Sequence, residues 1–221
     1  MSILQNQVIV LQAGYSYEDA IDVDAMRANC SCTLVRCRDG SNIIVDTLTA
    51  WDGEHLKSLL AAQGLQTDDI NVVVCTHGHS DHIGCNYLFQ NARLHIVGSS
   101  ASNRDLYFEH SGALDTNGEV LIEQTPGHTL SCISVLVHNT QLGGTVGICG
   151  DLFERCEDVD DEQIWKEAGS ENEKRQAEER YRMSQLCGHI VPGHGPMFPL
   201  DDAIRAKLKL THSQINNVQT E

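Results

Sequence analysis

The chain has 221 residues, of which 41% are hydrophobic, and it carries 31 acidic against 15 basic residues, for a formal net charge of −16. This length suits one domain with a substantial core, so we interpret residues 1–221 as a single domain. The acidic balance argues against a protein that binds nucleic acid over its whole surface, because phosphate affinity depends on Lys and Arg.

Several features predict a protein that stays inside the cell. The first residues, Met1-Ser-Ile-Leu-Gln-Asn-Gln, lack the basic and apolar regions of a signal peptide. No apolar run approaches the ~20 residues that a membrane helix needs, so we expect no membrane partner. The nine cysteines have no paired zinc-finger spacing, which favours reduced thiols over disulfides. We therefore expect a cytosolic protein that is not secreted, with the nucleus as a further location.

The first half of the chain alternates between strand-like and helix-like patterns. β-Branched or alternating residues predict strands at Gln7–Ala13, Cys30–Cys37 and Asn42–Asp46, with a hairpin turn at Asp39-Gly40 between the last two. A helix should begin at an Asp52 N-cap and end before Gly64. The pattern then predicts a strand at Val72–Thr76, a helix from Cys85 to Phe89, and a strand at Leu94–Val97.

A polar stretch with loop signals follows from Ser99 to Gly118. Within it, Leu106–His110 holds an adjacent aromatic pair. This segment is interpreted either as a short strand that packs on the core or as a wall of a substrate cleft.

The loop after Val72–Thr76 contains four side chains of metal-binding type within six positions: His77, His79, Asp81 and His82. Imidazole nitrogen and carboxylate oxygen are donors that suit zinc. We expect Gly78 and Gly84 to let the backbone turn these donors inward. Four donors at this spacing cannot all reach one ion, which favours two metals with further ligands from elsewhere.

The second half predicts strands at Glu119–Gln124, Ser131–His138, Thr145–Gly150 and Gly188–Val191. The charge-rich stretch from Asp160 to Gln185, which includes Arg180, is interpreted as a solvated helix, and a closing helix is expected from Leu200. Two groups of strands with helices outside them predict an α/β (α+β) fold, an αββα four-layer sandwich of two mixed β-sheets.

Three more donors follow strand-like runs in this half: His128, Asp151 and His194, each within a glycine-containing turn. Strand ends from both sheets meet at one edge of such a sandwich. We therefore expect these donors to gather around the His77 loop.

The order H-x-H-x-D-H, then His, Asp and His resembles the metallo-β-lactamase superfamily of binuclear hydrolases, over roughly Val8 to Pro199. The resemblance implies His77, His79 and His128 on one zinc ion, Asp81, His82 and His194 on a second, and Asp151 bridging both. It thus implies two zinc ions per chain, with iron or manganese as alternatives. It also implies that Asp46 supports a ligand, although an ordinary turn aspartate is an equal interpretation.

The resemblance implies hydrolysis by a hydroxide held between two metals, with Asp81 as the catalytic residue that orients it and accepts its proton. His82, directly after the loop aspartate, favours the glyoxalase II or phosphodiesterase type of site over antibiotic hydrolysis. The segments Gly150–Arg155 and Val191–Pro196 resemble one branch most closely. That branch implies a homodimeric endoribonuclease that cleaves the 3′ end of replication-dependent histone pre-mRNA.

Other interpretations remain open. Arg155 could contact a substrate phosphate or form a surface salt bridge. A glyoxalase II-like thioesterase acting on a small thioester is the main alternative to an RNA substrate. A mononuclear iron enzyme resembling persulfide dioxygenases is disfavoured by His82 and His194, which leave donors for a second metal. A non-catalytic zinc-binding module is the option outside enzymes.

Overall fold

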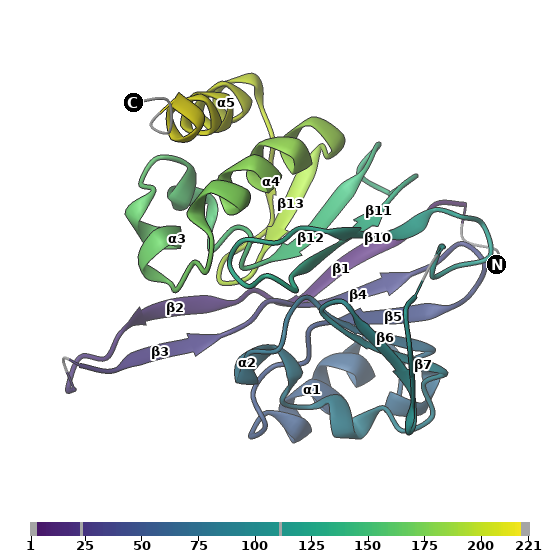
Figure 1. Cartoon of the computed structure of the whole chain (residues 1–221). Coiled ribbons are helices and arrows are strands. Elements are labelled where there is room, and N and C mark those ends of the chain that lie inside the picture. Colours follow the sequence, from purple (N-terminus) through teal and green to yellow (C-terminus); the bar gives the residue numbers. More distant parts are fainter. Residues whose placement is uncertain (1–3, 23, 111, 218–221) are drawn as a thin grey trace.

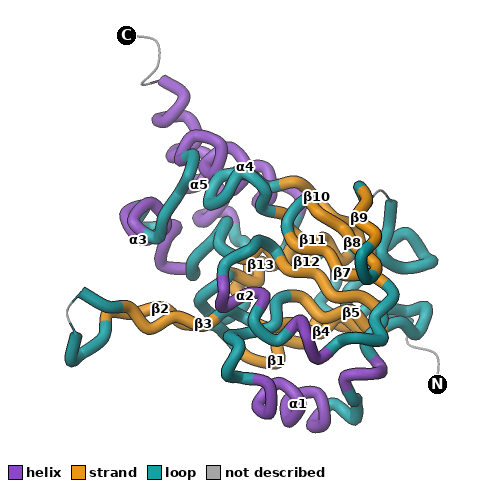
Figure 2. Tube along the Cα trace, turned by 60° about the horizontal axis from the view of Figure 1, so that its bottom comes forward, coloured by secondary structure: helices purple, strands orange, loops and turns teal. Residues whose placement is uncertain are grey.

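Two mixed β-sheets face each other, and helices cover the outer face of each (Figure 1). The computed structural model describes residues 4–22, 24–110 and 112–217. This arrangement is the αββα sandwich that the sequence predicted. Figure 2 shows the strands of both sheets in the middle of the molecule, with α1 on one side and α4 and α5 on the other.

The first sheet has seven strands in the order β1-β4-β5-β6-β7-β8-β9. β6 pairs in parallel with β5 and β7, whereas the other neighbours are antiparallel. The strands are β1 (Gln7–Gln12), β4 (Cys32–Arg36), β5 (Asn42–Val45), β6 (Val72–Cys75), β7 (Leu94–Val97), β8 (Ser100–Asn103) and β9 (Leu106–Phe108).

The second sheet has five strands in chain order, and only β12 and β13 pair in parallel. Its strands are β10 (Val120–Gln124), β11 (Ile133–Val137), β12 (Val146–Gly150), β13 (His189–Pro192) and β14 (Phe198–Pro199). The helices are α1 (Gly53–Ala62), α2 (Ser80–Ile83), α3 (Gln163–Glu167), α4 (Glu173–Leu186) and α5 (Asp202–Asn217), with 3₁₀ turns at Thr67–Asp69, Asn86–Leu88 and Cys156–Val159.

Three buried apolar layers hold the sandwich together. The central layer joins inward-facing side chains of both sheets, such as Val74 and Ile148. Alternate residues on the first sheet, including Val73, pack against Leu56 and Leu60 of α1. On the other outer face, residues such as Leu136 pack against Met183 of α4 and Leu208 of α5. Because alternate side chains of a strand point to opposite faces, each sheet contributes residues to the central layer and to one outer layer.

A two-stranded hairpin, β2 (Tyr15–Glu18) and β3 (Met26–Asn29), was missed by the sequence analysis. Its strands, Tyr-Ser-Tyr-Glu and Met-Arg-Ala-Asn, alternate apolar and polar residues, but each has only four residues and most of the side chains are exposed, so the signal is weak. Figure 1 shows the hairpin projecting away from the two sheets.

Two helix predictions were wrong. No α-helix runs from Cys85 to Phe89; instead, α2 lies within the ligand loop and a 3₁₀ turn follows at Asn86–Leu88. The stretch from Asp160 to Gln185 divides into α3 and α4 around Gly169, whose φ is 102°. The side chain of Asn172 caps α4 by accepting a hydrogen bond from the backbone N–H of Arg175 at 3.0 Å.

The predicted short strand at Leu106–His110 exists as β9, but its three side chains are exposed rather than packed on the core. Since β9 is the last strand of its sheet, it lies at an edge. Its residues do not line the cavity beside the ligand loop. All nine cysteines are unpaired. Among the described residues, no helix combines the length and hydrophobicity needed to span a membrane.

Candidate metal centre

The ligand loop begins where the buried strand β6 ends. All four residues of β6 are buried, and Thr76 leads directly into His77. His79 precedes the short helix α2, which carries Asp81 and His82. The loop therefore delivers four donors from one strand end, as the sequence predicted from their spacing.

The roles expected of the loop glycines were only partly correct. A Cβ on Gly78 would meet nothing within 4 Å, and Gly78 does not have a positive φ. Gly84 adopts helical backbone angles, with φ at −61°. A Cβ there would overlap the backbone of Thr49 and Ala50. Gly84 is thus required by close packing, and Gly78 is not required by conformation.

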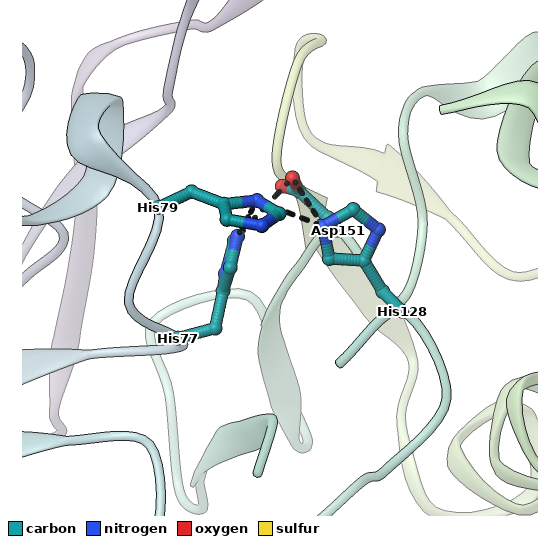
Figure 3. A group of neighbouring side chains, drawn as sticks. All are labelled: His77, His79, His128 and Asp151. Carbon is teal, nitrogen blue, oxygen red and sulfur yellow. Dashed lines mark hydrogen bonds and ion pairs between the residues drawn. The ribbon is translucent and has the colours of Figure 1, made fainter. Parts of the chain in front are cut away.

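The first donor group is formed by His77, His79 and His128 (Figure 3). Nε2 of His77 lies 2.8 Å from Nδ1 of His79, and Nε2 of His128 lies 3.1 Å from the same atom. His128 reaches this point from the turn after β10, far from the loop in sequence. Three ring nitrogens therefore converge on one point.

The second donor group is formed by Asp81, His82 and His194. Oδ2 of Asp81 lies 3.8 Å from Nε2 of His82 and 3.8 Å from Nε2 of His194. Nδ1 of His194 lies 3.1 Å from the backbone oxygen of Asn29 and 3.2 Å from that of Tyr15, which leaves Nε2 toward the centre. β13 and the hairpin together thus orient this ligand.

Asp151 lies between the two groups. Its Oδ2 is 3.5 Å from Nε2 of His77 and 3.3 Å from Nε2 of His194, while its Oδ1 is 3.1 Å from Nε2 of His82. A Cβ on Gly193 would overlap this carboxylate, so the close approach of the two chain segments requires glycine there. The structure therefore brings all seven predicted ligands into one cluster.

The unsatisfied atoms of this cluster fit metal ions. Two imidazole nitrogens that face each other cannot both present lone pairs without a proton or cation between them. Nε2 of His82 and Oδ1 of Asp151 are buried and lack a hydrogen-bond partner, although they lie 3.1 Å apart. Buried donors and acceptors without partners are costly. Imidazole and carboxylate donors suit zinc in particular.

The surroundings lower the pKa of two of the histidines and raise that of two others. Burial lowers the pKa of His77 well below its usual value, and it also lowers that of His128. Burial has the same tendency at His82, but the Asp151 and Asp46 carboxylates outweigh it and raise the pKa well above its usual value. At His194, burial is outweighed by the hydrogen bond with Asp151, and the pKa rises to about 9.

The two remaining predicted residues, Asp46 and Arg155, lie beside the donor cluster. Asp46 lies behind the centre, with Oδ2 at 3.0 Å from Nδ1 of His82. Arg155 lines the cavity, but its Nη1 donates to the backbone oxygen and the hydroxyl of Ser16, both at 3.1 Å. Arg155 thus ties the hairpin to the loop after β12, and it forms no salt bridge with any residue that the structure describes.

A cavity of about 580 Å³ opens onto the donors. His79, Asp81, Asp151 and His194 line it, together with residues of the hairpin and of α3. Tyr17 on the hairpin is 54% exposed and lines this space. The sequence analysis did not single out Tyr17, because it found no strand in that region.

Glu154 is a second residue that the sequence analysis missed. It lines the same cavity and is buried beside Asp151 and His194. Burial raises its pKa well above the usual value for glutamate, and the Asp151 carboxylate adds to this effect. A glutamate three residues after a metal ligand has no distinctive local pattern, so only its position in space reveals it.

Comparison with known proteins identifies the family of this chain. The family model "Metallo-beta-lactamase superfamily" matches residues 26–194. Metallo-beta-lactamase domain-containing protein 1 of Xenopus laevis is 38% identical over 199 residues, which cover 87% of this chain and 81% of the relative. The resemblance of the loop and turn motifs to this branch of the family is therefore confirmed.

Solved structures share the fold at low sequence identity. A metallo-β-lactamase-like protein from Thermotoga maritima has a TM-score of 0.65 at 18% identity, covering 88% of this chain and 99% of that chain. AidC, a dizinc quorum-quenching lactonase with N-hexanoyl-L-homoserine product bound, has a TM-score of 0.59 at 16% identity, covering 78% and 74%.

Proposed function

We propose that this chain, which belongs to the metallo-β-lactamase superfamily, is a hydrolase that uses two metal ions at the centre described above. The observation that carries this proposal is the position of Asp151, whose two carboxylate oxygens face donors of both groups. A carboxylate between two sets of imidazoles suits a pair of cations better than a single one. We propose zinc for both positions, with iron or manganese as alternatives.

Two metals in such a centre lower the pKa of bound water and polarise the oxygen of a substrate. The chain itself supplies Asp81 beside them. Its carboxylate is partly exposed and lines the cavity, so it can accept a hydrogen bond from an attacking water and take up its proton. Buried His77 and His82 keep their rings fixed, because neighbouring side chains enclose them completely.

For the substrate, we propose a phosphodiester of single-stranded RNA, in particular the 3′ end of replication-dependent histone pre-mRNA. The closer sequence resemblance supports this choice. The exposed ring of Tyr17 in the cavity adds a physical argument, because unpaired bases stack on aromatic side chains beside an active site. Arg155, held at the same wall, supplies a cation near the metals.

A small thioester is the second candidate, and the charge of the cavity favours it. Three further carboxyl side chains line the walls, from Glu18, Asp161 and Glu167. They would repel the many phosphates of an RNA strand more strongly than a small thioester of low net charge. An RNA strand would extend past these carboxylates, whereas a small thioester would not.

A parallel assay separates these candidates. A 3′-labelled histone pre-mRNA fragment and S-lactoylglutathione are incubated with the metal-loaded protein, with and without a chelator, and with D81N as a control. Chelator-sensitive cleavage of the RNA that D81N abolishes would support the RNA proposal. Turnover of the thioester without cleavage of the RNA would contradict the RNA proposal and support the thioester proposal. A protein that binds no metal when metal is supplied in excess would remove the hydrolase proposal.

We also propose that the protein acts as a homodimer. The edge strand β9 exposes Leu106, Tyr107 and Phe108, and an exposed apolar edge is suited to pairing with a second copy. Light scattering after gel filtration should give twice the monomer mass. Y107K should shift the protein to monomer, and a monomeric wild type would contradict the proposal.

A further inference from the structure

The strongest unexplained feature near the centre is the side chain of Glu154. It is only 2% exposed, and its Oε1 is buried without a hydrogen-bond partner among the described residues. Its Oε2 lies 3.9 Å from Nε2 of His194. A buried carboxyl group that lacks a donor is costly, so its position requires a compensating interaction.

The protein cations nearby are engaged elsewhere. Arg180 forms an ion pair with the buried Asp158, at 2.6 Å between Nη2 and Oδ1. Arg155 donates to Ser16 of the hairpin. The other charged groups that act on Glu154 are the carboxylates of Asp151 and Asp158, which have the same sign, and the ring of His82. Among the described residues, Glu154 therefore forms no ion pair with an arginine or lysine, and its cationic neighbours are the imidazoles of His194 and His82.

The backbone fixes Glu154 firmly in this place. Its N–H donates to Oδ2 of Asp158 at 2.7 Å, and its carbonyl accepts the N–H of His194 at 2.7 Å. Asp151 belongs to the same short loop as Glu154, and His194 is connected to that loop by this hydrogen bond. Ligand atoms of Asp151, Glu154 and His194 all lie within 4.8 Å of one another, a spacing that could hold an ion.

We propose that Glu154 is a further ligand of the metal bound by the second donor group. This inference rests on the proposed two-metal centre and extends it. The second metal would then have three carboxylates, from Asp81, Asp151 and Glu154, and two imidazoles, from His82 and His194. The first metal would have three imidazoles and a share of Asp151. The negative charge of Glu154 should therefore strengthen binding of the second metal selectively.

The test compares E154Q with the wild type and with E167Q. Glutamine keeps the shape of the side chain but removes its charge. Glu167 lines the same cavity outside the donor clusters, so E167Q controls for a general loss of negative charge. Zinc is titrated against a chromophoric chelator, and bound zinc is counted by elemental analysis. Melting of each metal-free protein provides a measurement independent of metal and of activity.

We expect the wild type and E167Q to bind two zinc ions. E154Q should bind the first with unchanged affinity and the second at least about tenfold more weakly, as for loss of a supporting group at a metal site. Metal-free E154Q should be about as stable as the wild type, because glutamine keeps the shape of the side chain and adds no charge. E154D, which keeps the charge, should recover part of the affinity.

Three results would overturn the proposal: wild-type affinity for both ions in E154Q, an equal loss in E167Q, or a metal-free E154Q that does not fold. The last result would show that the carboxyl group serves the fold. In each of these cases the wild type would still bind two ions, and the proposed hydrolase would stand. Failure of the wild type to bind metal would instead remove the proposed function itself.

Discussion

Asp46 Oδ2 lies 3.0 Å from Nδ1 of His82, on the side of the ring that faces away from Asp151. Oδ1 of the same carboxylate accepts the backbone N–H of Thr76 at 2.7 Å. Asp46 has a φ of 58°, a left-handed conformation that costs a non-glycine residue energy. A strained aspartate thus joins the end of β6 to a fully buried histidine and directs its Nε2 toward the donor cluster.

We predict that D46N weakens the second metal selectively. Asparagine can keep the hydrogen bond to Thr76 but loses the charge that raises the basicity of His82. The affinity for the second zinc ion should fall by roughly 10- to 100-fold, the usual effect of removing such a partner. Competitive zinc titration measures this. D68N, which alters an exposed acid far from the centre, should behave as the wild type; a D46N protein with unchanged affinities would contradict the role of Asp46.

We predict that the second metal binds more tightly as the pH rises toward about 9. The carboxylates around His82 raise its pKa well above the usual value, and the pKa of His194 rises to about 9, so a metal that binds near neutral pH must displace protons from these rings. The pKa values of His77 and His128 are lowered, so these two ligands are already neutral at pH 7. Binding of the first metal should therefore change little between pH 7 and 9.

Zinc titrations at several pH values, with the released protons counted by a weakly buffered indicator, measure this difference. The apparent affinity of the second metal should rise by up to about tenfold per pH unit for each proton displaced. The same slope for both metals would show that the two donor groups do not differ in protonation.

We predict that the buried ion pair between Arg180 and Asp158 supports the loop after β12. Arg180 is 1% exposed, in contrast to the solvated position expected from the sequence, and it also donates to the backbone oxygen of Leu152 at 2.9 Å. R180M would leave Asp158 buried and unpaired, which should cost about 3–5 kcal/mol of unfolding free energy. Urea denaturation of the metal-free protein measures it.

R182M is the matched control on the same helix. Arg182 pairs with Glu123 and Glu179 at a partly exposed position, so its loss should cost less than about 1 kcal/mol. Equal costs for the two substitutions would mean that the buried pair contributes no more than a surface pair.

We predict that G193A disrupts the centre, because the added methyl group would overlap the Asp151 carboxylate. The variant should lose affinity for both metals, since Asp151 contacts both donor groups. G78A lies within the ligand loop but places its methyl group in open space, so it should retain both metals. Elemental analysis compares the two variants, and full metal content in G193A would show that the carboxylate can move without loss.

The fold and the donor set were largely open to prediction because each depends on local patterns. Buried β-branched runs such as Val72–Thr76 identify strands, and donors directly after them identify a strand-end site. The hairpin strands Tyr15–Glu18 and Met26–Asn29 were missed, since each alternates over only four residues and buries almost none of its side chains. The division of the charged stretch into α3 and α4 was missed because the helical pattern continues on either side of Gly169.

The family, the two-sheet architecture and the residues able to bind metal follow from the amino-acid sequence alone. Spacing within a loop and residue type after a strand are local properties, so a single sequence is enough to recognise them. The burial of Arg180, the contact of Arg155 with the hairpin and the position of Glu154 beside the second donor group become visible only in the folded chain. These roles depend on which charges the fold brings together and shields from water, and no local pattern in the chain encodes that.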